Sequence, residues 1–537
     1  MQLLNLEKTE GFQKTLLALL CSGLLSLVFL NQEQFLLTWF AFIPLLLATR
    51  RTSLLTTYLL SLLAGFCMFA SATYWITDFL QLSKAQSLHT RLIWASLYWL
   101  YCGHLIAFVF VLFKLLKRFT VVHEFILFPL SVALLTHGYP MLFPMHLGES
   151  QTHFLWAIQA TEFVGVLGLD TLIALVNIMF YRLILCLFHQ PPKIRISLQW
   201  PWVISTTVVV AWFVIGGIRL EHWQNRMLDA DSLKIGLVQP NEIPSLDKNT
   251  IQQGYSTAFP PEMEMTQRLS ELGAEIVIWP EAQPKQYIND LFVRRAYRRE
   301  IDDLDIGLVF QDQQQLTDPV NGRVVERFNA SMMIDNTGIE SGFYQKIKRI
   351  PFGEYIPLTK PGSDMHRWLL SFFGQFASEL SAGDEFTSFV HDKVNIIPLI
   401  CYETTFSGFV ANAVASNSQH SHNDSGNVLV GLSNDGWFGS RHQSNQHILA
   451  STLRAVENRL PLIHAVNNGP SLVVSPTGEV VFQSDFQHAG GYLVDVNTSP
   501  DAKGSFYSEY PMAFVYFIFA LVGYVVININ ITIRQKH

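Results

Sequence analysis

Charged side chains are scarce in this sequence. They make up 15% of the 537 residues, whereas soluble domains usually carry about 25%. Half of the residues are hydrophobic, which excludes one ordinary water-soluble domain as a description of the whole chain. The formal net charge of −7 shows no basic excess, so we expect no nucleic-acid partner.

Cysteine is also scarce, and its five positions are unevenly placed. The polar part of the chain holds a single cysteine, Cys401, which excludes an intramolecular disulfide there. Cys401 is therefore either an inert buried residue or a reactive thiol. The other four lie in apolar stretches and are Cys21, Cys67, Cys102 and Cys186.

Long apolar runs are abundant, and several reach the ~20 residues that a membrane-spanning helix needs. We predict a transmembrane domain of seven helices at 1–222, followed near the other end by an eighth helix and a cytoplasmic tail at 508–537. No cleavable signal peptide is evident. The apolar segments are 13–30, 35–49, 54–80, 92–116, 121–138, 162–188, 201–218 and 511–533.

Basic residues in short loops predict the orientation of these helices. With the N-terminus in the cytoplasm, the loops on the inner side hold more lysine and arginine than those outside, where Lys84 and Arg91 are the main ones. Seven spans then place 223–507 on the outer side of the membrane. The inner-side residues are Arg50, Arg51, Lys114, Lys117, Arg118, Lys193, Arg195, Arg534 and Lys536.

Residues 223–507 have the pattern of an α/β domain. Short β-rich runs alternate in part with amphipathic helical patterns at 260–272 and 446–459, which favours a sheet covered by helices. The runs are 235–238, 276–279, 307–310, 396–400, 428–432 and 462–465. The polar stretch at 416–427 reads as an exposed loop.

Three polar motifs follow apolar runs, where sites form in α/β domains. They are IVIWPEAQP at 276–284, YQKIKRIPFGEYIPL at 344–358 and PLICYETTF at 398–406. A thiol attacks an acyl carbon as thiolate, so Cys401 needs a base, and Glu281 can act as one if its pKa is raised. Lys346 can stabilise a developing oxyanion, while Glu354 and Glu403 orient that lysine.

Each motif alone also has a structural explanation. A cysteine after an apolar strand is more often a core residue than a nucleophile. Lysines beside Lys348 and Arg349 usually form a solvated face, and a glutamate after a strand often only closes a turn. The joint occurrence of the three motifs in this order favours a catalytic site.

The three motifs together resemble the nitrilase superfamily, and within it the apolipoprotein N-acyltransferase family. The resemblance implies a membrane-bound helical domain joined to an α-β-β-α sandwich with a Glu-Lys-Cys triad. It extends over most of the chain. The matching segments are PFGEYIPL at 351–358, CYE at 401–403, LSNDGWFG at 432–439, RAVENRLPLIHAVNNG at 454–469, FPMHLGESQ at 143–151 and QATEFVGVLGLDTLIALVN at 159–177.

Carried onto this sequence, the resemblance implies Glu281 as base, Lys346 as oxyanion stabiliser and Cys401 as nucleophile. Supporting residues are Glu354, Glu403, Tyr402 and Trp437. Cys401 would take an acyl chain from a phospholipid such as phosphatidylethanolamine. The thioester would then acylate the amine of a diacylglyceryl-cysteine lipoprotein. We expect a monomer that needs no cofactor and no metal.

Some positions depart from the family pattern, namely QPNEIPSLDKN at 239–249, Met145, His464 and Pro470. They leave open another amine acceptor, or a membrane-tethered amidase that uses water. A non-catalytic scaffold is a third alternative. Four histidines are candidate metal ligands, namely His420, His422, His442 and His447, but no cysteine or compact set of carboxylates completes such a site. We expect His447 on the helix after the WFG loop.

Overall fold

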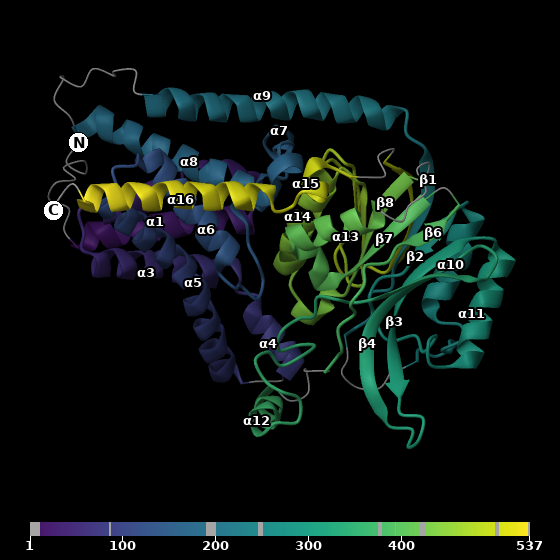
Figure 1. Cartoon of the computed structure of the whole chain (residues 1–537). Helices are drawn as coiled ribbons and strands as arrows, with labels where there is room; N and C mark the ends of the chain where they lie inside the picture. The colour runs from purple at the N-terminus through teal and green to yellow at the C-terminus, as the bar shows by residue number, and fades with distance from the viewer. Residues whose placement is uncertain are drawn as a thin grey trace. The chain divides into compact units, whose positions relative to one another are not determined.

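The computed structural model describes residues 11–84, 87–189, 200–244, 251–373, 379–392, 394–418, 426–499 and 504–534. The chain divides into two compact units. Unit 1 comprises 1–77, 87–220 and 510–537, and unit 2 comprises 78–86 and 221–509. Figure 1 labels the elements of both units.

Unit 1 is helical. Within the described residues, six helices are long and apolar enough to cross a membrane. They are α1 (Gly11–Leu30), α3 (Leu54–Ala72), α5 (Leu88–Phe119), α8 (Thr161–His189), α9 (Trp200–Leu228, which continues into unit 2) and α16 (Ala513–Arg534). A shorter apolar helix, α6, spans Glu124–Gly138, and the small elements are η4 (Leu147–Gln151) and α7 (Leu155–Ile158).

The second apolar segment, expected at 35–49, is not one helix. It forms η3 (Gln32–Trp39) and α2 (Ile43–Thr49) with a break between them. Pro44 lies in the first turn of α2 and cannot donate to a preceding helical turn. The Asn177 side chain of α8 satisfies the break, because it accepts from Phe42 N at 2.9 Å and donates to Thr38 O at 2.9 Å.

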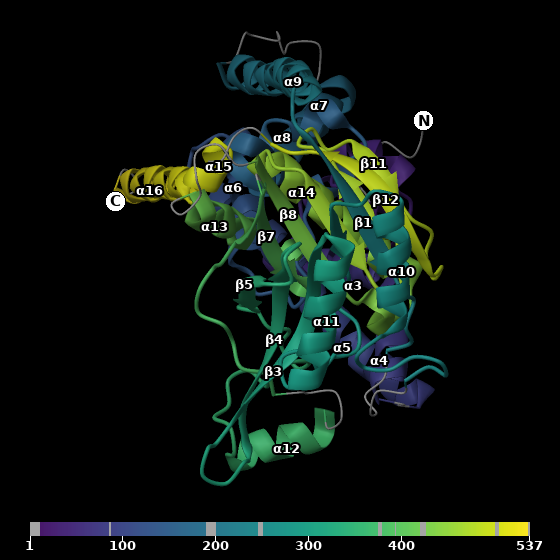
Figure 2. The ribbon, with the colours of Figure 1, turned by 90° about the vertical axis from the view of Figure 1, so that its right-hand side faces the viewer.

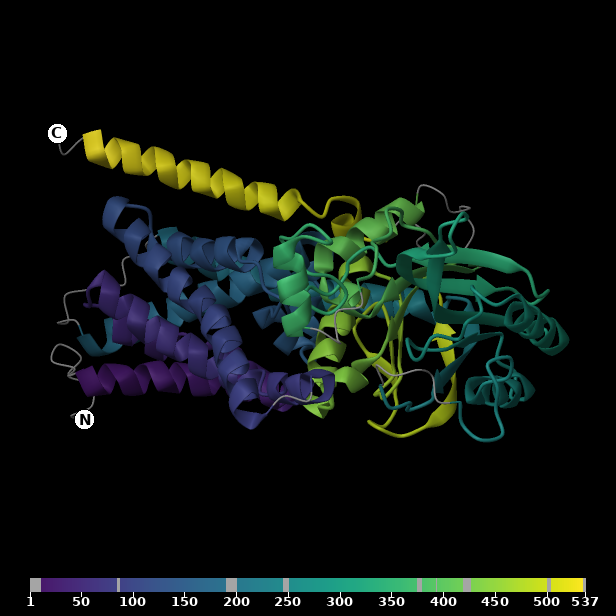
Figure 3. The ribbon, with the colours of Figure 1, turned by 90° about the horizontal axis from the view of Figure 1, so that it is seen from below.

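Glycine allows α3 and α5 to approach closely. A Cβ added at Gly65 would lie 2.5 Å from the carbonyl oxygen of Gly103 on the facing helix. Small residues at such crossings let the backbones of membrane helices pack against each other. In Figure 3, α1, α3 and α5 are the purple to blue helices of unit 1.

Unit 2 contains two six-stranded sheets. The first has the order β12-β1-β2-β3-β4-β5 and the second β11-β10-β9-β8-β7-β6. Strands β1, β2 and β3 are parallel, as are β7, β8 and β9. The strands are β1 (Ser232–Gln239), β2 (Ile276–Ile278), β3 (Gly307–Thr317), β4 (Val324–Ile334), β5 (Glu340–Gln345), β6 (Phe389–His391), β7 (Val394–Ile400), β8 (Gly426–Ser433), β9 (Leu462–Val466), β10 (Leu472–Val474), β11 (Val480–Gln483) and β12 (Gly490–Asn497).

Three hydrophobic clusters define four layers. The largest lies between the sheets and joins residues such as Ile235 and Ile278 of the first sheet to Ile396 and Val430 of the second. A second cluster packs α10 (Pro261–Glu271) and α11 (Leu291–Leu304) on the outer face of the first sheet. A third packs α13 (Ser407–Ser418) and α14 (Arg441–Asn458) on the second sheet. The resulting α-β-β-α sandwich confirms the expected fold, and Figure 2 looks onto α10 and α11.

All six β-rich runs expected from the sequence form strands, namely β1, β2, β3, β7, β8 and β9. The two expected helices are α10 and α14. Unit 2 also contains α4 (Ile76–Lys84, in part), α12 (Asp364–Phe373), α15 (Phe506–Glu509), η5 (Cys401–Thr405) and η6 (Asp435–Phe438).

Candidate active site

Cys401 lies at the sharp turn between β7 and η5. Its φ of 52° is in the left-handed region, which a non-glycine residue rarely adopts and which costs about 1–2 kcal/mol. The residue is 7% exposed and belongs to the cluster between the sheets. Burial, with the Glu281 carboxylate close by, raises the pKa of the Cys401 thiol, while Lys346 opposes that rise. The thiol therefore needs a base to react.

Glu281 supplies a carboxylate at the end of the neighbouring sheet, just after β2. The Cys401 thiol donates to it, and Asn329 Nδ2 donates to Glu281 Oε1 at 2.8 Å. Burial raises the pKa of Glu281, against the opposing charge of Lys346. A carboxylate with a raised pKa next to a thiol has the properties of a general base.

Lys346 follows β5 and is 1% exposed. Its Nζ lies 2.8 Å from Glu354 Oε1. Burial alone lowers the pKa of Lys346, but the Glu354 and Glu281 carboxylates and Cys401 outweigh burial and raise it. The ammonium therefore stays charged beside the thiol, where an oxyanion would form.

Glu354 is held by its own turn as well as by Lys346. Its Oε2 accepts from Ile350 N at 2.7 Å, which closes the loop that follows Lys346. One carboxylate oxygen thus binds the backbone of this loop while the other pairs with the lysine.

Glu403 joins the two sheets behind Cys401. Its Oε1 accepts from Tyr344 Oη, Ile347 N and Lys348 N at 2.8 to 2.9 Å, all on or just after β5. Its Oε2 accepts from Ile400 N at the end of β7, at 2.8 Å. Burial raises the pKa of Glu403 to about 7. This residue positions backbone segments of both sheets and does not pair directly with Lys346.

Tyr402 and Trp437 lie on the two short 3-10 helices. Tyr402 is buried in η5, and its ring packs edge-on to Phe406 with centroids 4.7 Å apart. Trp437 is half-buried in η6. The structure thus brings Glu281, Lys346, Cys401, Glu354 and Glu403 into one network, with Tyr402 beside it.

Asn329 was not singled out from the sequence. It lies on β4, and its one amide nitrogen reaches Glu281 Oε1 at 2.8 Å and Glu354 Oε1 at 3.5 Å. Gln311 Nε2 donates to its oxygen at 2.9 Å. A lone amide among the apolar residues of FNASMMI is the signal that marks this position.

Asp435 and His447 form a second buried pair near the nucleophile. His447 Nδ1 lies 3.0 Å from Asp435 Oδ1, and His447 Nε2 lies 2.8 Å from Thr404 Oγ1 in η5. Burial alone lowers the pKa of His447, but the Asp435 carboxylate outweighs burial and raises that pKa. Thr404 Oγ1 in turn donates to Cys401 O at 3.0 Å, so the pair supports the turn that carries Cys401.

The four histidines considered as metal ligands lie in two different parts of the chain. His447 lies on α14, as expected, and His442 lies on the same helix. His420 and His422 fall outside the described residues, as does most of the loop at 416–427. No group of three or more metal-ligating side chains occurs in the parts of the chain that the structure describes.

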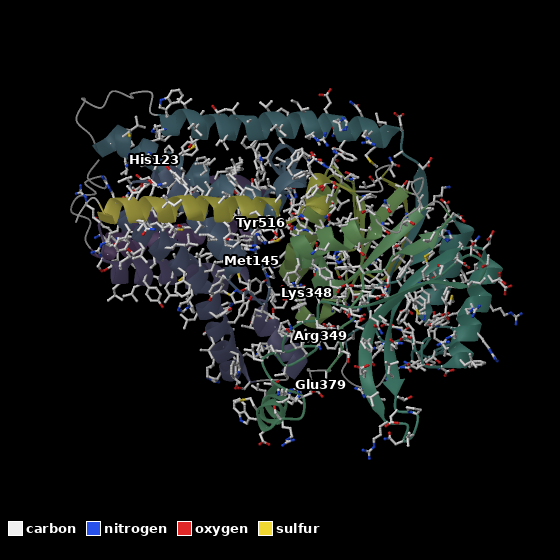
Figure 4. The ribbon with its side chains drawn as sticks, viewed as in Figure 1. His123, Met145, Lys348, Arg349, Glu379 and Tyr516 are labelled. Carbon is white, nitrogen blue, oxygen red and sulfur yellow. The ribbon has the colours of Figure 1, made fainter. Side chains whose placement is uncertain are left out.

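The departures from the family pattern have definite places. His464 is buried behind the site, with its ring 4.7 Å from that of His447 and Nε2 2.6 Å from Ser433 Oγ. Pro470 follows a cis peptide bond. Glu242, in the segment 239–249, lines a pocket of about 320 Å³ with Lys285. Met145 lies in unit 1 and is labelled in Figure 4.

Two family models match the chain. The model for the apolipoprotein N-acyltransferase N-terminal domain matches residues 21–179, and the carbon-nitrogen hydrolase model matches residues 235–499. Together they cover most of the sequence. The chain belongs to the apolipoprotein N-acyltransferase family.

Relatives from this family are distant in sequence. The apolipoprotein N-acyltransferase of Geobacter metallireducens is 26% identical over 487 residues, which cover 87% of this chain and 86% of the relative. That of Rickettsia bellii is 25% identical over 375 residues, or 68% of each chain. Among solved structures, an amidase from Nesterenkonia sp. is 19% identical, with a TM-score of 0.36, and the match covers 50% of this chain and 92% of the amidase.

Proposed function

We propose that this protein transfers a fatty acyl chain from a phospholipid to the N-terminal amine of a diacylglyceryl-cysteine lipoprotein. The observation that carries the proposal is that the buried side chains of Glu281, Lys346 and Cys401 interact electrostatically with one another in a chain of this family. Phosphatidylethanolamine is the proposed donor. Glu354, Glu403, Tyr402 and Trp437 support the site.

The first half of the reaction makes a thioester. Glu281 takes the thiol proton, and the Cys401 sulfur attacks the ester carbonyl of the phospholipid. Lys346 and the backbone N–H of Tyr402 stabilise the tetrahedral oxyanion. When the C–O bond breaks, the glycerol oxygen takes the proton from Glu281 and leaves as a lysophospholipid.

The second half makes the amide. The neutral amine of the acceptor attacks the thioester carbonyl, and Glu281 takes a proton from the attacking nitrogen. The C–S bond breaks as the oxyanion collapses, and Glu281 returns the proton to the sulfur. The acyl-enzyme therefore forms and decays with the same base and the same oxyanion stabiliser.

The proposed arrangement follows the apolar segments and loop charges. We infer a transmembrane domain at 1–222, a periplasmic catalytic domain at 223–507, and a last helix with a cytoplasmic tail at 508–537 in the bacterial inner membrane. The protein acts as a monomer, since Glu281, Lys346 and Cys401 all come from one chain. Both substrates are lipid-anchored, so a membrane-bound enzyme meets them at high local concentration.

The test is intact-mass spectrometry of the detergent-purified protein after incubation with phosphatidylethanolamine. We expect a mass gain of one acyl chain that hydroxylamine removes and that Cys401→Ala lacks. Addition of a diacylglyceryl lipopeptide should then discharge the thioester and yield the N-acylated peptide. Absence of any acyl adduct from several phospholipids, in a protein that still reacts with an activated acyl ester, would refute a lipid donor.

A further inference from the structure

Lys348 is a second lysine fixed close to the nucleophile. It follows Lys346 by two residues, and its backbone N donates to Glu403 Oε1 at 2.9 Å. Glu403 itself lies two residues after Cys401, in the same η5 turn. The main chain of Lys348 is thereby tied to the turn that carries the thiol.

The side chain of Lys348 lies over an aromatic ring of the same turn. Its Nζ is 3.8 Å from the centroid of Phe406, and the Phe406 ring packs edge-on to Tyr402 at 4.7 Å. A cation held over a ring face has a restricted position and loses part of its hydration. The ammonium therefore lies over Phe406, and the ring of Phe406 in turn contacts Tyr402, the residue that follows Cys401.

This ammonium lacks a carboxylate partner in the described part of the chain. Lys346 pairs with Glu354, whereas no described residue forms an ion pair with Lys348. The nearest carboxylate, Glu403, already accepts four hydrogen bonds. Burial lowers the pKa of Lys348, against the opposing charge of Glu403, so the ammonium is partly desolvated and a bound anion would favour its charged form.

The adjacent Arg349 is engaged by the protein. Its guanidinium lies over the ring of Tyr355, at 4.4 Å from the centroid, and Nη1 donates to Leu380 O at 2.5 Å. Figure 4 labels both residues on the catalytic unit. Of these two neighbouring cations, Arg349 donates a side-chain hydrogen bond within the protein, whereas the Lys348 ammonium donates none to the described residues.

We propose that Lys348 binds the phosphodiester of the acyl-donor phospholipid. The inference rests on the proposed function and assigns a headgroup contact to that same site. Only the glycerol backbone separates the phosphate of a phospholipid from its ester carbonyl, so a cation near Cys401 is suitably placed. A lysine binds phosphate as a compact charge with three donors.

This contact would distinguish the two lipid substrates. The donor carries a phosphodiester, whereas the diacylglyceryl acceptor carries none. A cation at this position therefore favours the donor while the thiol is free, and it adds nothing to the binding of the acceptor. Lys348 therefore contributes to the step that loads Cys401 and not to the step that unloads it.

The experiment compares two acyl donors in the full-length protein in detergent. One is phosphatidylethanolamine, and the other is a p-nitrophenyl ester of the same fatty acid, which has no phosphate. The rate of Cys401 acylation is measured by intact mass for the wild type, Lys348→Met, Lys348→Arg and the exposed control Lys360→Met. The readout is kcat/KM for acylation by phosphatidylethanolamine divided by kcat/KM for acylation by the p-nitrophenyl ester.

We expect Lys348→Met to lower this ratio about tenfold through a higher KM for the phospholipid, since a hydrogen bond to a charged group is lost. Lys348→Arg should retain most of it, and Lys360→Met should equal the wild type. An unchanged ratio in Lys348→Met, with phospholipid still acylating the wild type, would overturn the inference alone. Failure of the wild type to accept phospholipid, with the p-nitrophenyl ester still active, would instead refute the proposed function.

Inorganic phosphate, added at constant ionic strength, tests whether Lys348 binds free phosphate and not the phosphodiester of a lipid. If it inhibits the wild type but not Lys348→Met, and the donor ratio is unchanged, the lysine binds a free anion and the lipid assignment is wrong.

Discussion

At the scale of single residues, the site depends on a few shared hydrogen bonds. One amide, Asn329, reaches both Glu281 and Glu354, and one carboxylate, Glu403, receives donors from both sheets. Buried groups of this kind hold the reacting side chains in one geometry. Their removal should affect the chemical step more than binding.

Asn329→Ala should slow formation of the acyl-enzyme about tenfold, because the hydrogen bond that holds Glu281 is lost. The rate is measured by quenched-flow intact mass with phosphatidylethanolamine. Asn336→Ala, at an exposed turn next to Asp305, is the matched control. Equal rates for the two variants would show that Asn329 has no positioning role.

Glu403 should give the folded protein a pH-dependent stability. Its pKa is about 7 when folded, against an ordinary value of 4.5, so the unfolded chain releases this proton first as the pH rises. The free energy of unfolding should therefore fall by about 3 kcal/mol as the pH rises through that window.

Glu403→Gln cannot ionise and should lack this slope. The melting temperatures of the wild type and the variant, measured between about pH 5 and pH 7.5, give the difference. Parallel curves for the two proteins would contradict a raised pKa at Glu403.

At the scale of elements, α14 supports the turn that carries the nucleophile. His447 of α14 contacts Thr404 of η5 and pairs with Asp435 of η6. Three elements thus meet through one imidazole behind Cys401. Helix α14 thus contributes to the site through His447.

His447→Ala should slow acyl-enzyme formation about tenfold, since Thr404 loses its buried partner. His447→Gln, which can still bond to Thr404, should recover part of the rate. His442→Ala on the same helix serves as the control. A loss of thermal stability with an unchanged acylation rate would limit His447 to a structural role.

The crossing of α3 and α5 gives a separate prediction. Gly65→Ala places a methyl group 2.5 Å from Gly103 O and should destabilise unit 1 by about 1–3 kcal/mol. Gly23→Ala on α1 meets no atom within 4 Å and should be neutral or slightly stabilising. Melting temperatures of the two purified variants in detergent provide the comparison.

The sequence predicts the inner strands well and the outer ones poorly. The central parallel strands β7 and β8 are almost continuous apolar runs, because both of their faces are covered. Strand β12 alternates exposed and buried residues and pairs with β1 across more than 200 residues of sequence, which no local pattern reveals. Strand β4, which brings Asn329 to the site, pairs with β3 across a short turn and is exposed along its first four residues.

The site follows the same division. Glu281 and Cys401 each follow an apolar run, whereas Lys346 follows the mixed strand ESGFYQ and is marked by the PFGE segment after it. The pairing of His447 with Asp435 depends on a helix packing against a 3-10 turn, and only the fold shows it. Similarly, Pro44 gives a reason for the broken second segment, but the capping by Asn177 is a long-range contact.

At the scale of the whole molecule, the family and the apolar helices make this a membrane protein. The proposed orientation leads to a direct test. Alkaline phosphatase inserted in the exposed β3–β4 turn at 318–322 should be active, because this enzyme works only in the periplasm. A green fluorescent protein fused to the C-terminus should fluoresce, as it does in the cytoplasm. The reverse pattern would invert the orientation.

Because of the contacts of Glu403, the loss of activity on heating reports the separation of the two sheets. The same carboxylate that sets the Lys346 and Cys401 segments side by side fastens one sheet to the other. A separation of the sheets large enough to admit water would pull the lysine segment away from the thiol at the same moment. On heating, catalysis should therefore be lost as soon as the two sheets separate, before the outer helices unfold. No partly unfolded form should remain active.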